Sequence, residues 1–387
     1  MTSTSNDVTV YWDDICLEHE PPAGEFEMEW TGRLAVREPH PDRPERLLNV
    51  RQILQETMVD RVTWAEVSPA TREQVERVHD PAYVDEFEAF CEAGGGRLTA
   101  DTGANEASYA AARYAAGGAI AAAEHALGPG PEDVPYALVR PSGHHAQPDR
   151  ADGFCFFNNV AVAADHVLAT TAAERVAIVD WDVHHGNGTQ ECFYDRDDVL
   201  VVGVHNDHWA WDPDAHPQTG DLDEDGRGAG EGYNVNVPLP PGTGDEGYRH
   251  VFERVVEPVV THFDPDLLLV SAGQDPGIVD PLGRNLVTKR GFEMLGRRAR
   301  ALAATAADGN LALVQEGGYQ ISHLAYATLG VVEGVVGHET GIDDPMAWLD
   351  EDLASARRAV EEAVEYHARA WPLEAGDPNL DTDDGGS

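Results

Sequence analysis

Residues 176–188 read VAIVDWDVHHGNG, and this stretch decides the fold class. An apolar run, VAIV, passes directly into a segment of aspartate, histidine and glycine. A short, continuous apolar run bounded by turn-forming residues is typical of a parallel strand that is buried on both faces. Three more such runs, each followed by polar residues and glycines, occur along the chain: YALV at 136–139, LLLV at 267–270 and LALV at 311–314.

The segments between these runs are predicted to be helical. Residues 158–169, 248–263 and 290–306 are examples, and an alanine-rich helix is expected over 108–127 because alanine favours helix and permits close packing. Strand alternating with helix indicates an α/β fold built on a parallel sheet.

The domain organisation is predicted to be simple. A short strand at 9–12 and a long loop lead into a helix from about Glu45. No internal repeat and no linker divides the chain, so we expect one domain over residues 1–374. The last stretch, 375–387, is acidic and is predicted to be a disordered tail.

The charge balance is strongly acidic. The chain has 26 lysine and arginine residues against 70 aspartate and glutamate residues, a formal net charge of −44. Such an excess destabilises a fold through self-repulsion unless salt screens it, and the Debye length falls to about 3 Å at 1 M salt. We therefore expect adaptation to a salt-rich cytoplasm, as in a halophilic archaeon. Direct nucleic-acid binding is not expected, because it needs a basic surface.

The sequence also favours a cytoplasmic protein. No run approaches the roughly 18 apolar residues that a spanning helix needs, so no membrane segment is expected. The first residues lack the basic and apolar segments of a secretory signal. The four cysteines are far apart and form no CxxC pair, so reduced thiols are predicted rather than a disulfide framework; they are Cys16, Cys91, Cys155 and Cys192.

Every apolar run ends in residues that bind metals or carry protons. In open α/β sheets, ligands bind beyond the carboxyl ends of the strands, so these residues are expected to meet in one catalytic site. In chain order they are His144 and His145, then Asp180, Asp182, His184 and His185, then Asp275 and Asp280, and finally Tyr319.

The spacing of Asp182 and His184 favours a metal site. The two residues lie two apart where a strand ends, so their side chains point the same way. Asp275 supplies a third ligand from another strand end. Three protein ligands and an open position are the pattern of a catalytic zinc site. His185 is predicted to point away and to be structural.

The tandem histidines, His144 and His145, are predicted to be an acid/base pair, with Asp180 and Asn187 as the partners that orient them. These partners differ physically, because a carboxylate raises the basicity of a histidine and an amide does not. Tyr319, on a glycine turn, is positioned to donate its hydroxyl to a developing oxyanion.

Together these motifs resemble the zinc-dependent histone deacetylase superfamily, which includes acetylpolyamine amidohydrolases. Trp181 and Asn187 resemble its class II branch. The resemblance implies the arginase/deacetylase fold, a single α/β domain around an eight-stranded parallel sheet, and hydrolysis of an acetylated amine to acetate and free amine. The motifs extend from about His40 to about Tyr319: RPSGHHA (140–146), DGFCFFNN (152–159), YNVNVPLP (233–240), SAGQDPGIVDPLG (271–283) and QEGGY (315–319), with VDWDVHHGNGTQ (179–190).

The resemblance also implies roles for individual residues. It matches Asp182, His184 and Asp275 to the zinc ligands, His144 and His145 to the catalytic pair, and Tyr319 to the transition-state tyrosine. It adds substrate-binding positions at Gly153, whose carbonyl meets the substrate amide, Phe154, which walls an acyl-lysine channel, and Gly318. It implies one potassium site at Asp180, with the backbone carbonyls of Asp182 and His184, and another at the carbonyls of Phe193, Arg196, Val199 and Tyr233.

Two departures from the family pattern stand out. Gly203 occupies a position where a serine hydroxyl often completes the first potassium site. His216 stands where a second channel phenylalanine is usual, so the shape of the channel is open.

The sequence leaves alternatives for the function. A binuclear manganese hydrolase of the arginase type shares the fold, but Gln274 and Pro276 flank Asp275 where extra aspartates are needed. A catalytically silent acetyl-lysine binding module is the other alternative, although no ligand, histidine or tyrosine is missing. Acetylated protein lysine and acetylated polyamine both fit as substrates, and the sequence leaves a homo-oligomer open.

Overall fold

The computed structural model describes residues 7–23, 35–36, 38–99, 101–128, 133–207, 219–346 and 349–374. His216 and the acidic segment 375–387 lie outside the described residues. Within these ranges, no helix combines the length and the apolar character that crossing a membrane requires. The four cysteines are free, and three of them are buried.

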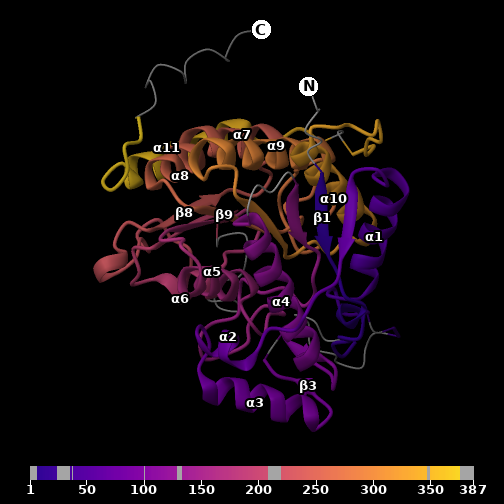
Figure 1. The fold of residues 1–387 in the computed structure, drawn as a ribbon. Coiled ribbons are helices and arrows are strands. Elements are labelled where there is room, and N and C mark those ends of the chain that lie inside the picture. Colours follow the sequence, from indigo (N-terminus) through magenta and orange to yellow (C-terminus); the bar gives the residue numbers. More distant parts are fainter. Residues whose placement is uncertain are drawn as a thin grey trace.

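A single eight-stranded sheet forms the centre of the structure (Figure 1). Its order is β2-β1-β5-β10-β9-β6-β7-β8, and every pair is parallel, which confirms the predicted sheet. The strands are β1 (Val8–Tyr11), β2 (Val62–Ala65), β5 (Val134–Ala137), β6 (Val176–Asp180), β7 (Val199–Asn206), β8 (Asn234–Leu239), β9 (Leu267–Ala272) and β10 (Leu311–Gln315). A small antiparallel pair, β3 (Gly96–Arg97) and β4 (Gly103–Ala104), lies apart from the sheet.

The predicted strand runs coincide with central strands. Every residue of β6, β9 and β10 is buried, as a strand covered on both faces requires. The run at 136–139 differs slightly, because β5 begins and ends two residues earlier than the run. Leu138 and Val139 are buried beyond the end of the strand, so an apolar run reports burial rather than the exact limits of pairing.

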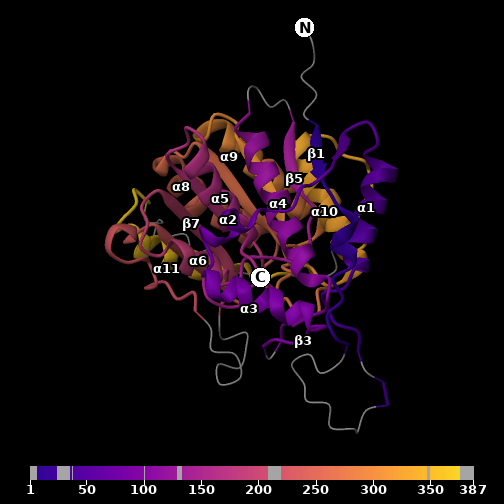
Figure 2. The same cartoon turned by 60° about the horizontal axis from the view of Figure 1, so that its bottom comes forward.

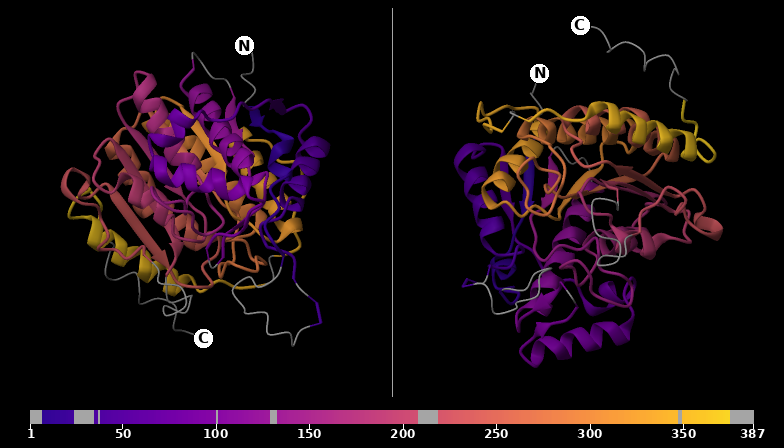
Figure 3. Two further views of the ribbon diagram at one scale, coloured as in Figure 1. Left: turned by 90° about the horizontal axis from the view of Figure 1, so that it is seen from below. Right: turned by 180° about the vertical axis from the view of Figure 1, so that it is seen from behind.

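Helices cover both faces of the sheet. Figure 1 shows α7, α8, α9 and α11 above it and α4 and α5 below it, with α2 and α3 further out, and Figures 2 and 3 show the same layers from other sides. The helices are α1 (Glu45–Thr57), α2 (Arg72–Glu76), α3 (Pro81–Glu92), α4 (Ser108–Ala126), α5 (Asn159–Thr170), α6 (Asn187–Phe193), α7 (Asp245–Val251), α8 (Glu257–Phe263), α9 (Lys289–Ala306), α10 (Ile321–Val336) and α11 (Leu353–His367).

The alanine-rich prediction is confirmed as α4, which is largely buried. Gly117 on this helix shows how close the packing is. A Cβ there would stand 2.0 Å from the carbonyl oxygen of Ser68. Small side chains on α4 therefore let this helix lie directly against its neighbours.

The predicted helical segment over 248–263 is confirmed, and the structure adds a π turn inside it. It divides into α7 and α8, with a π-helical turn over Phe252–Val256 between them. Pro258 has no N–H to donate to the carbonyl four residues earlier, and the Glu257 N–H bonds instead to the Phe252 carbonyl, five residues back. The extra residue per turn accommodates the proline without ending the helical path.

Candidate active site

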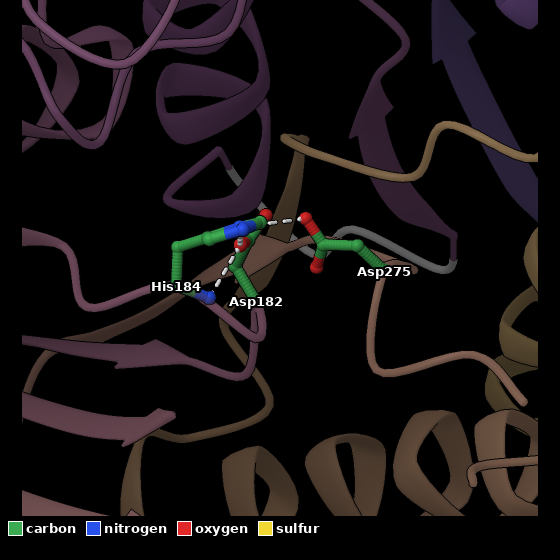
Figure 4. A group of neighbouring side chains, drawn as sticks. All are labelled: Asp182, His184 and Asp275. Carbon is green, nitrogen blue, oxygen red and sulfur yellow. Dashed lines mark hydrogen bonds and ion pairs between the residues drawn. The ribbon is translucent and has the colours of Figure 1, made fainter. Parts of the chain in front are cut away.

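Three potential metal ligands meet at the carboxyl ends of two adjacent strands. Asp182 and His184 follow β6, and Asp275 follows β9. The Nδ1 atom of His184 lies 3.1 Å from an oxygen of Asp182 and 3.1 Å from an oxygen of Asp275 (Figure 4). One ligand atom from each residue lies within 4.8 Å of the others. The structure therefore brings together the three residues that the spacing assigns to one ion.

Backbone groups hold the two carboxylates in place. The N–H of Gly317 donates to Asp182 at 2.8 Å, and the N–H of Val183 donates to Asp275 at 2.8 Å. A Cβ at Gly317 would stand 2.1 Å from Asp275 and 2.6 Å from Asp182. Glycine at 317 thus lets the chain after β10 pass close to both acids and donate to Asp182.

The charges of this group fit a divalent cation. Both carboxylates are buried, and across the described ranges neither forms an ion pair with lysine or arginine. Burial and the charge of Asp182 raise the pKa of Asp275 to about 7. Against the effect of burial, Asp275 and Asp182 raise the pKa of His184 to about 10. Two buried acids and a histidine, with no lysine or arginine paired to them in the described ranges, are a donor set of the kind that binds zinc.

One side of the group is open. The side chain of His184 is 19% exposed, whereas those of Asp182 and Asp275 are fully covered. A ligand would therefore approach on the side of the histidine.

His144 is paired with a carboxylate. Its Nδ1 atom lies 2.9 Å from Asp180, the last residue of β6, and both side chains are buried. Burial opposes the charged ring, but Asp182 and Asp180 hold the pKa of His144 well above its usual range. The carboxylates beside His144 therefore favour its imidazolium form.

His145 is paired with an amide instead. Its Nδ1 atom lies 2.7 Å from the side-chain oxygen of Asn187. Burial, together with the positive charges of His144 and His184, holds the pKa of His145 well below its usual range. The two adjacent rings, 4.0 Å apart between centroids, therefore differ in charge because their partners differ.

Tyr319 lies beside His184. Its ring centroid is 6.4 Å from that of His184, and its backbone N–H donates to Asp280 at 2.6 Å. Burial raises the pKa of the Tyr319 hydroxyl well above its usual range, so the hydroxyl keeps its proton. The structure places Asp280, a candidate ligand from its strand end, at the base of the Tyr319 turn, where it also accepts the Gln320 N–H at 3.2 Å.

The turn at Gly153 and Phe154 forms a wall beside the histidines. Both residues have positive φ, 48° and 68°, a region that glycine adopts readily and in which other residues are strained. A Cβ at Gly153 would stand 2.2 Å from the His145 ring, so only glycine fits. The Phe154 ring lies 5.7 Å from that of Tyr319 and 4.8 Å from that of His40.

His185 and Gly318 have other contacts. The ring nitrogens of His185 lie 3.0 Å from Thr219 and 3.0 Å from Gln190, away from the metal ligands. The carbonyl of Gly318 accepts a hydrogen bond from Arg46 at 2.6 Å. Gly318 therefore shapes the turn before Tyr319 through its backbone.

The residues assigned to potassium lie in two places. Asp180 accepts the Asp182 N–H at 3.0 Å, beside the metal ligands, and Gly203 is its register partner on β7. The other set lies around the starts of β7 and β8. There the carbonyls of Phe193 and Tyr233 each accept one backbone N–H, from Arg196 and Val201, and a carbonyl has a second lone pair for a cation. Val199 begins β7.

Sequence reasoning missed several buried residues around the site. Arg46 from α1 donates to the carbonyls of Gly318 and Glu316, and its guanidinium lies 4.7 Å from the Tyr319 ring centroid. Glu316 accepts the Gly143 N–H at 2.7 Å. The only signal for them in the sequence was their position within the motifs PDRPERL and QEGGY.

Comparison with known proteins identifies the family. A model described as "Histone deacetylase domain" matches residues 40–335. "Histone deacetylase 8" of Arabidopsis thaliana is 39% identical over 376 residues, which cover 96% of this chain and 99% of the relative. "Histone deacetylase-like amidohydrolase" of Pseudomonas aeruginosa is 38% identical over 342 residues, which cover 87% of this chain and 88% of the relative.

Among solved structures, the crystal structure of the HDA15 HD domain superposes with a TM-score of 0.81 at 33% identity, covering 95% of this chain and 96% of that chain. This agreement extends to the parallel eight-stranded sheet and its flanking helices, the arginase/deacetylase fold. The chain therefore belongs to the histone deacetylase domain family.

Proposed function

We propose that the chain is a zinc-dependent deacetylase that hydrolyses an acetyl amide to acetate and a free amine. The observation that carries this proposal is the convergence of Asp182, His184 and Asp275 with two histidines of opposite charge preference. Family membership supports the deacetylase chemistry, and the donor set supports zinc.

Asp182, His184 and Asp275 would hold the ion. Bound there with an open coordination position, zinc would polarise the acetyl carbonyl and lower the pKa of a water molecule. Gly317 and Val183 keep the two carboxylates oriented through their N–H groups, so the ligands are preorganised.

His145 is the general base in this proposal. With its Nδ1–H donated to Asn187, its Nε2 atom carries a lone pair and makes no hydrogen bond within the described ranges. A neutral ring at this position takes a proton from the attacking water and later delivers it to the leaving amine. His144, cationic beside Asp180, stabilises the negative charge that develops.

Tyr319 supplies a hydrogen bond to the developing oxyanion. In this proposal its protonated hydroxyl faces the reacting carbonyl, and Asp280 and Arg46 fix the turn that presents it. Such a preorganised donor is worth about 2.7–4 kcal/mol in the transition state.

We propose an acetylated lysine of a protein or an acetylated polyamine as the substrate. Both present an acetamide on a flexible alkyl chain, as a narrow acyl-lysine channel requires. The Phe154 ring, which contacts the Tyr319 ring, would form one wall of that channel. The names of the two curated relatives, a histone deacetylase and a deacetylase-like amidohydrolase, support this class. Potassium at Asp180 and at the carbonyls around Val199 belongs to the same proposal.

The experiment measures acetate release by the purified chain in molar potassium chloride. An acetyl-lysine peptide and N-acetylspermidine are the two substrates. We expect release that a chelator abolishes and that zinc restores. Urea release from arginine or agmatine in the presence of manganese would instead establish the arginase-type alternative. Binding of the peptide without acetate release would establish the silent module.

A further inference from the structure

Asp152 contacts the partner of the general base. The side-chain nitrogen of Asn187 donates to Asp152 at 2.9 Å, while the side-chain oxygen of Asn187 faces His145. Asp152 lies just before the Gly153 turn, and a backbone bridge to Cys155 holds it there. The three side chains therefore form a chain from Asp152 through Asn187 to His145.

An asparagine alone does not determine which ring nitrogen of a neighbouring histidine carries the proton. The amide has a donor end and an acceptor end, and it can present either one to an imidazole. With the oxygen toward Nδ1, the ring carries its proton on Nδ1 and Nε2 is free to act as a base. With the nitrogen toward Nδ1, the proton moves to Nε2 and the ring cannot accept another there.

Asp152 removes this ambiguity, because an ionised carboxylate only accepts hydrogen bonds. It takes the amide N–H of Asn187 and thereby turns the amide oxygen toward His145. A second donor, the side-chain amide of Gln147, reaches the same oxygen of Asp152 at 3.1 Å. The N–H of Gly153 donates to the other oxygen at 3.1 Å.

We propose that Asp152 is a positioning residue that selects the Nδ1–H tautomer of His145 through Asn187. This inference rests on the proposed function only for its consequence, which is a base with a free Nε2. The tautomer itself is a property of these three side chains.

The surroundings of Asp152 are compatible with this role. Burial raises the pKa of Asp152, and the charge of Asp101 acts in the same direction, while Asn187, Gln147 and the Gly153 N–H favour the carboxylate. Arg150 is the nearby cation, and it bonds to Gln147 rather than to Asp152. The Asp152 carboxylate is thus hydrogen-bonded to the amide groups beside it.

The first test measures the tautomer directly. ¹⁵N-labelled histidine spectra of the zinc-loaded protein report which ring nitrogen carries the proton, and His145→Gln identifies the His145 signals among the 17 histidines. We expect the Nδ1–H form in the native chain and a mixture or the Nε2–H form in Asp152→Ala. An unchanged Nδ1–H signal in Asp152→Ala would overturn the inference, whatever the activity.

The second test uses rescue. Asp152→Ala is expected to lower kcat about tenfold or more with little change in KM, because general-base catalysis contributes 10²–10⁴-fold. Changing Asn187→Asp in an Asp152→Asn background places an acceptor-only group directly on His145 and should restore both the tautomer and most of kcat. A merely structural role of Asp152 would not respond to a change at residue 187, so a failure of this rescue counts against the inference.

Asp149→Ala is the matched control. Asp149 lies in the same loop, its side chain is 56% exposed, and it pairs with Arg150. We expect this variant to keep the Nδ1–H signal of His145 and the kcat of the native chain. If the native chain releases no acetate at all, the proposed function fails, and the spectra still decide the role of Asp152.

Discussion

The carboxylates at the ends of β6 and β9 and the carboxylates on the outer surface have different roles. Asp180, Asp182 and Asp275 are buried, and each is oriented by specific N–H or imidazole groups. Outer acids such as Asp343, 56% exposed and paired with Arg290, face solvent. Each inner acid therefore acts through its own fixed position and hydrogen bonds, whereas the outer acids act through their summed negative charge. Four experiments test this contrast.

The largest effect is expected from removing one inner carboxylate. Asp275→Ala should abolish acetate release and zinc binding, because the site loses one of three ligands. Salt should not restore either. Metal analysis beside the activity assay checks this, and a variant that keeps its zinc and its activity would contradict the metal assignment.

The next effect concerns a neutral group at the same site. Tyr319→Phe should lower kcat by about 10²–10³, with KM nearly unchanged, because its hydroxyl bonds to an oxyanion present only in the transition state. Steady-state kinetics on the acetyl-lysine peptide measure both constants. A rise in KM at constant kcat would make Tyr319 a binding residue.

A third experiment tests a buried acid beside the site, Glu316, through the pH dependence of the free energy of unfolding. Burial raises the pKa of Glu316 to about 8, and Asp180 and Asp182 act in the same direction, against His144 and the Gly143 N–H. The folded chain then holds a proton that the unfolded chain releases above about pH 4.3. The contribution to the free energy of unfolding is fully present below that pH and is lost as the pH rises toward 8.

Glu316→Gln should therefore flatten this fall, which is on the order of a few kcal/mol at about 1.4 kcal/mol for each pKa unit. Glutamine keeps an acceptor for the Gly143 N–H, so the loop geometry is retained. Urea unfolding at several pH values in molar potassium chloride measures the slope. Parallel profiles for the two proteins would show that Glu316 does not titrate in this window.

The smallest effect per residue is expected for the acids on the outer surface. A single exposed ion pair is worth little, but the net charge of −44 acts collectively. The melting temperature and activity should rise from dilute buffer to molar potassium chloride, because the Debye length shrinks from about 30 Å at 0.01 M to about 3 Å at 1 M. A flat melting temperature would mean that the acidic surface serves solubility alone.

Much of the fold was predictable because burial leaves a local mark on the sequence. The runs that became β6, β9 and β10 are continuously apolar, and α4 is marked by its alanines. The helical segment over 248–263 was predictable too, but the π turn inside it was not, because that turn depends on how the chain accommodates Pro258. The exact ends of elements were also missed, as β5 shows, because an apolar run reports burial and not the limits of strand pairing.

The residue types beyond each strand can be read from the sequence alone, since each of these apolar runs is followed within five residues by site residues. These are Asp182 and His184, Asp275, and Tyr319. Which of these residues contact one another depends on the tertiary structure. Strand order puts β9 beside β6 and so brings Asp275 to His184, while Arg46 reaches Gly318 and Asp152 reaches Asn187 across gaps that no local pattern spans. The physical reason is that hydrophobic periodicity reports only whether a side chain is buried. A hydrogen bond between distant residues depends on the packing of the whole chain, which sets the separation and direction of donor and acceptor.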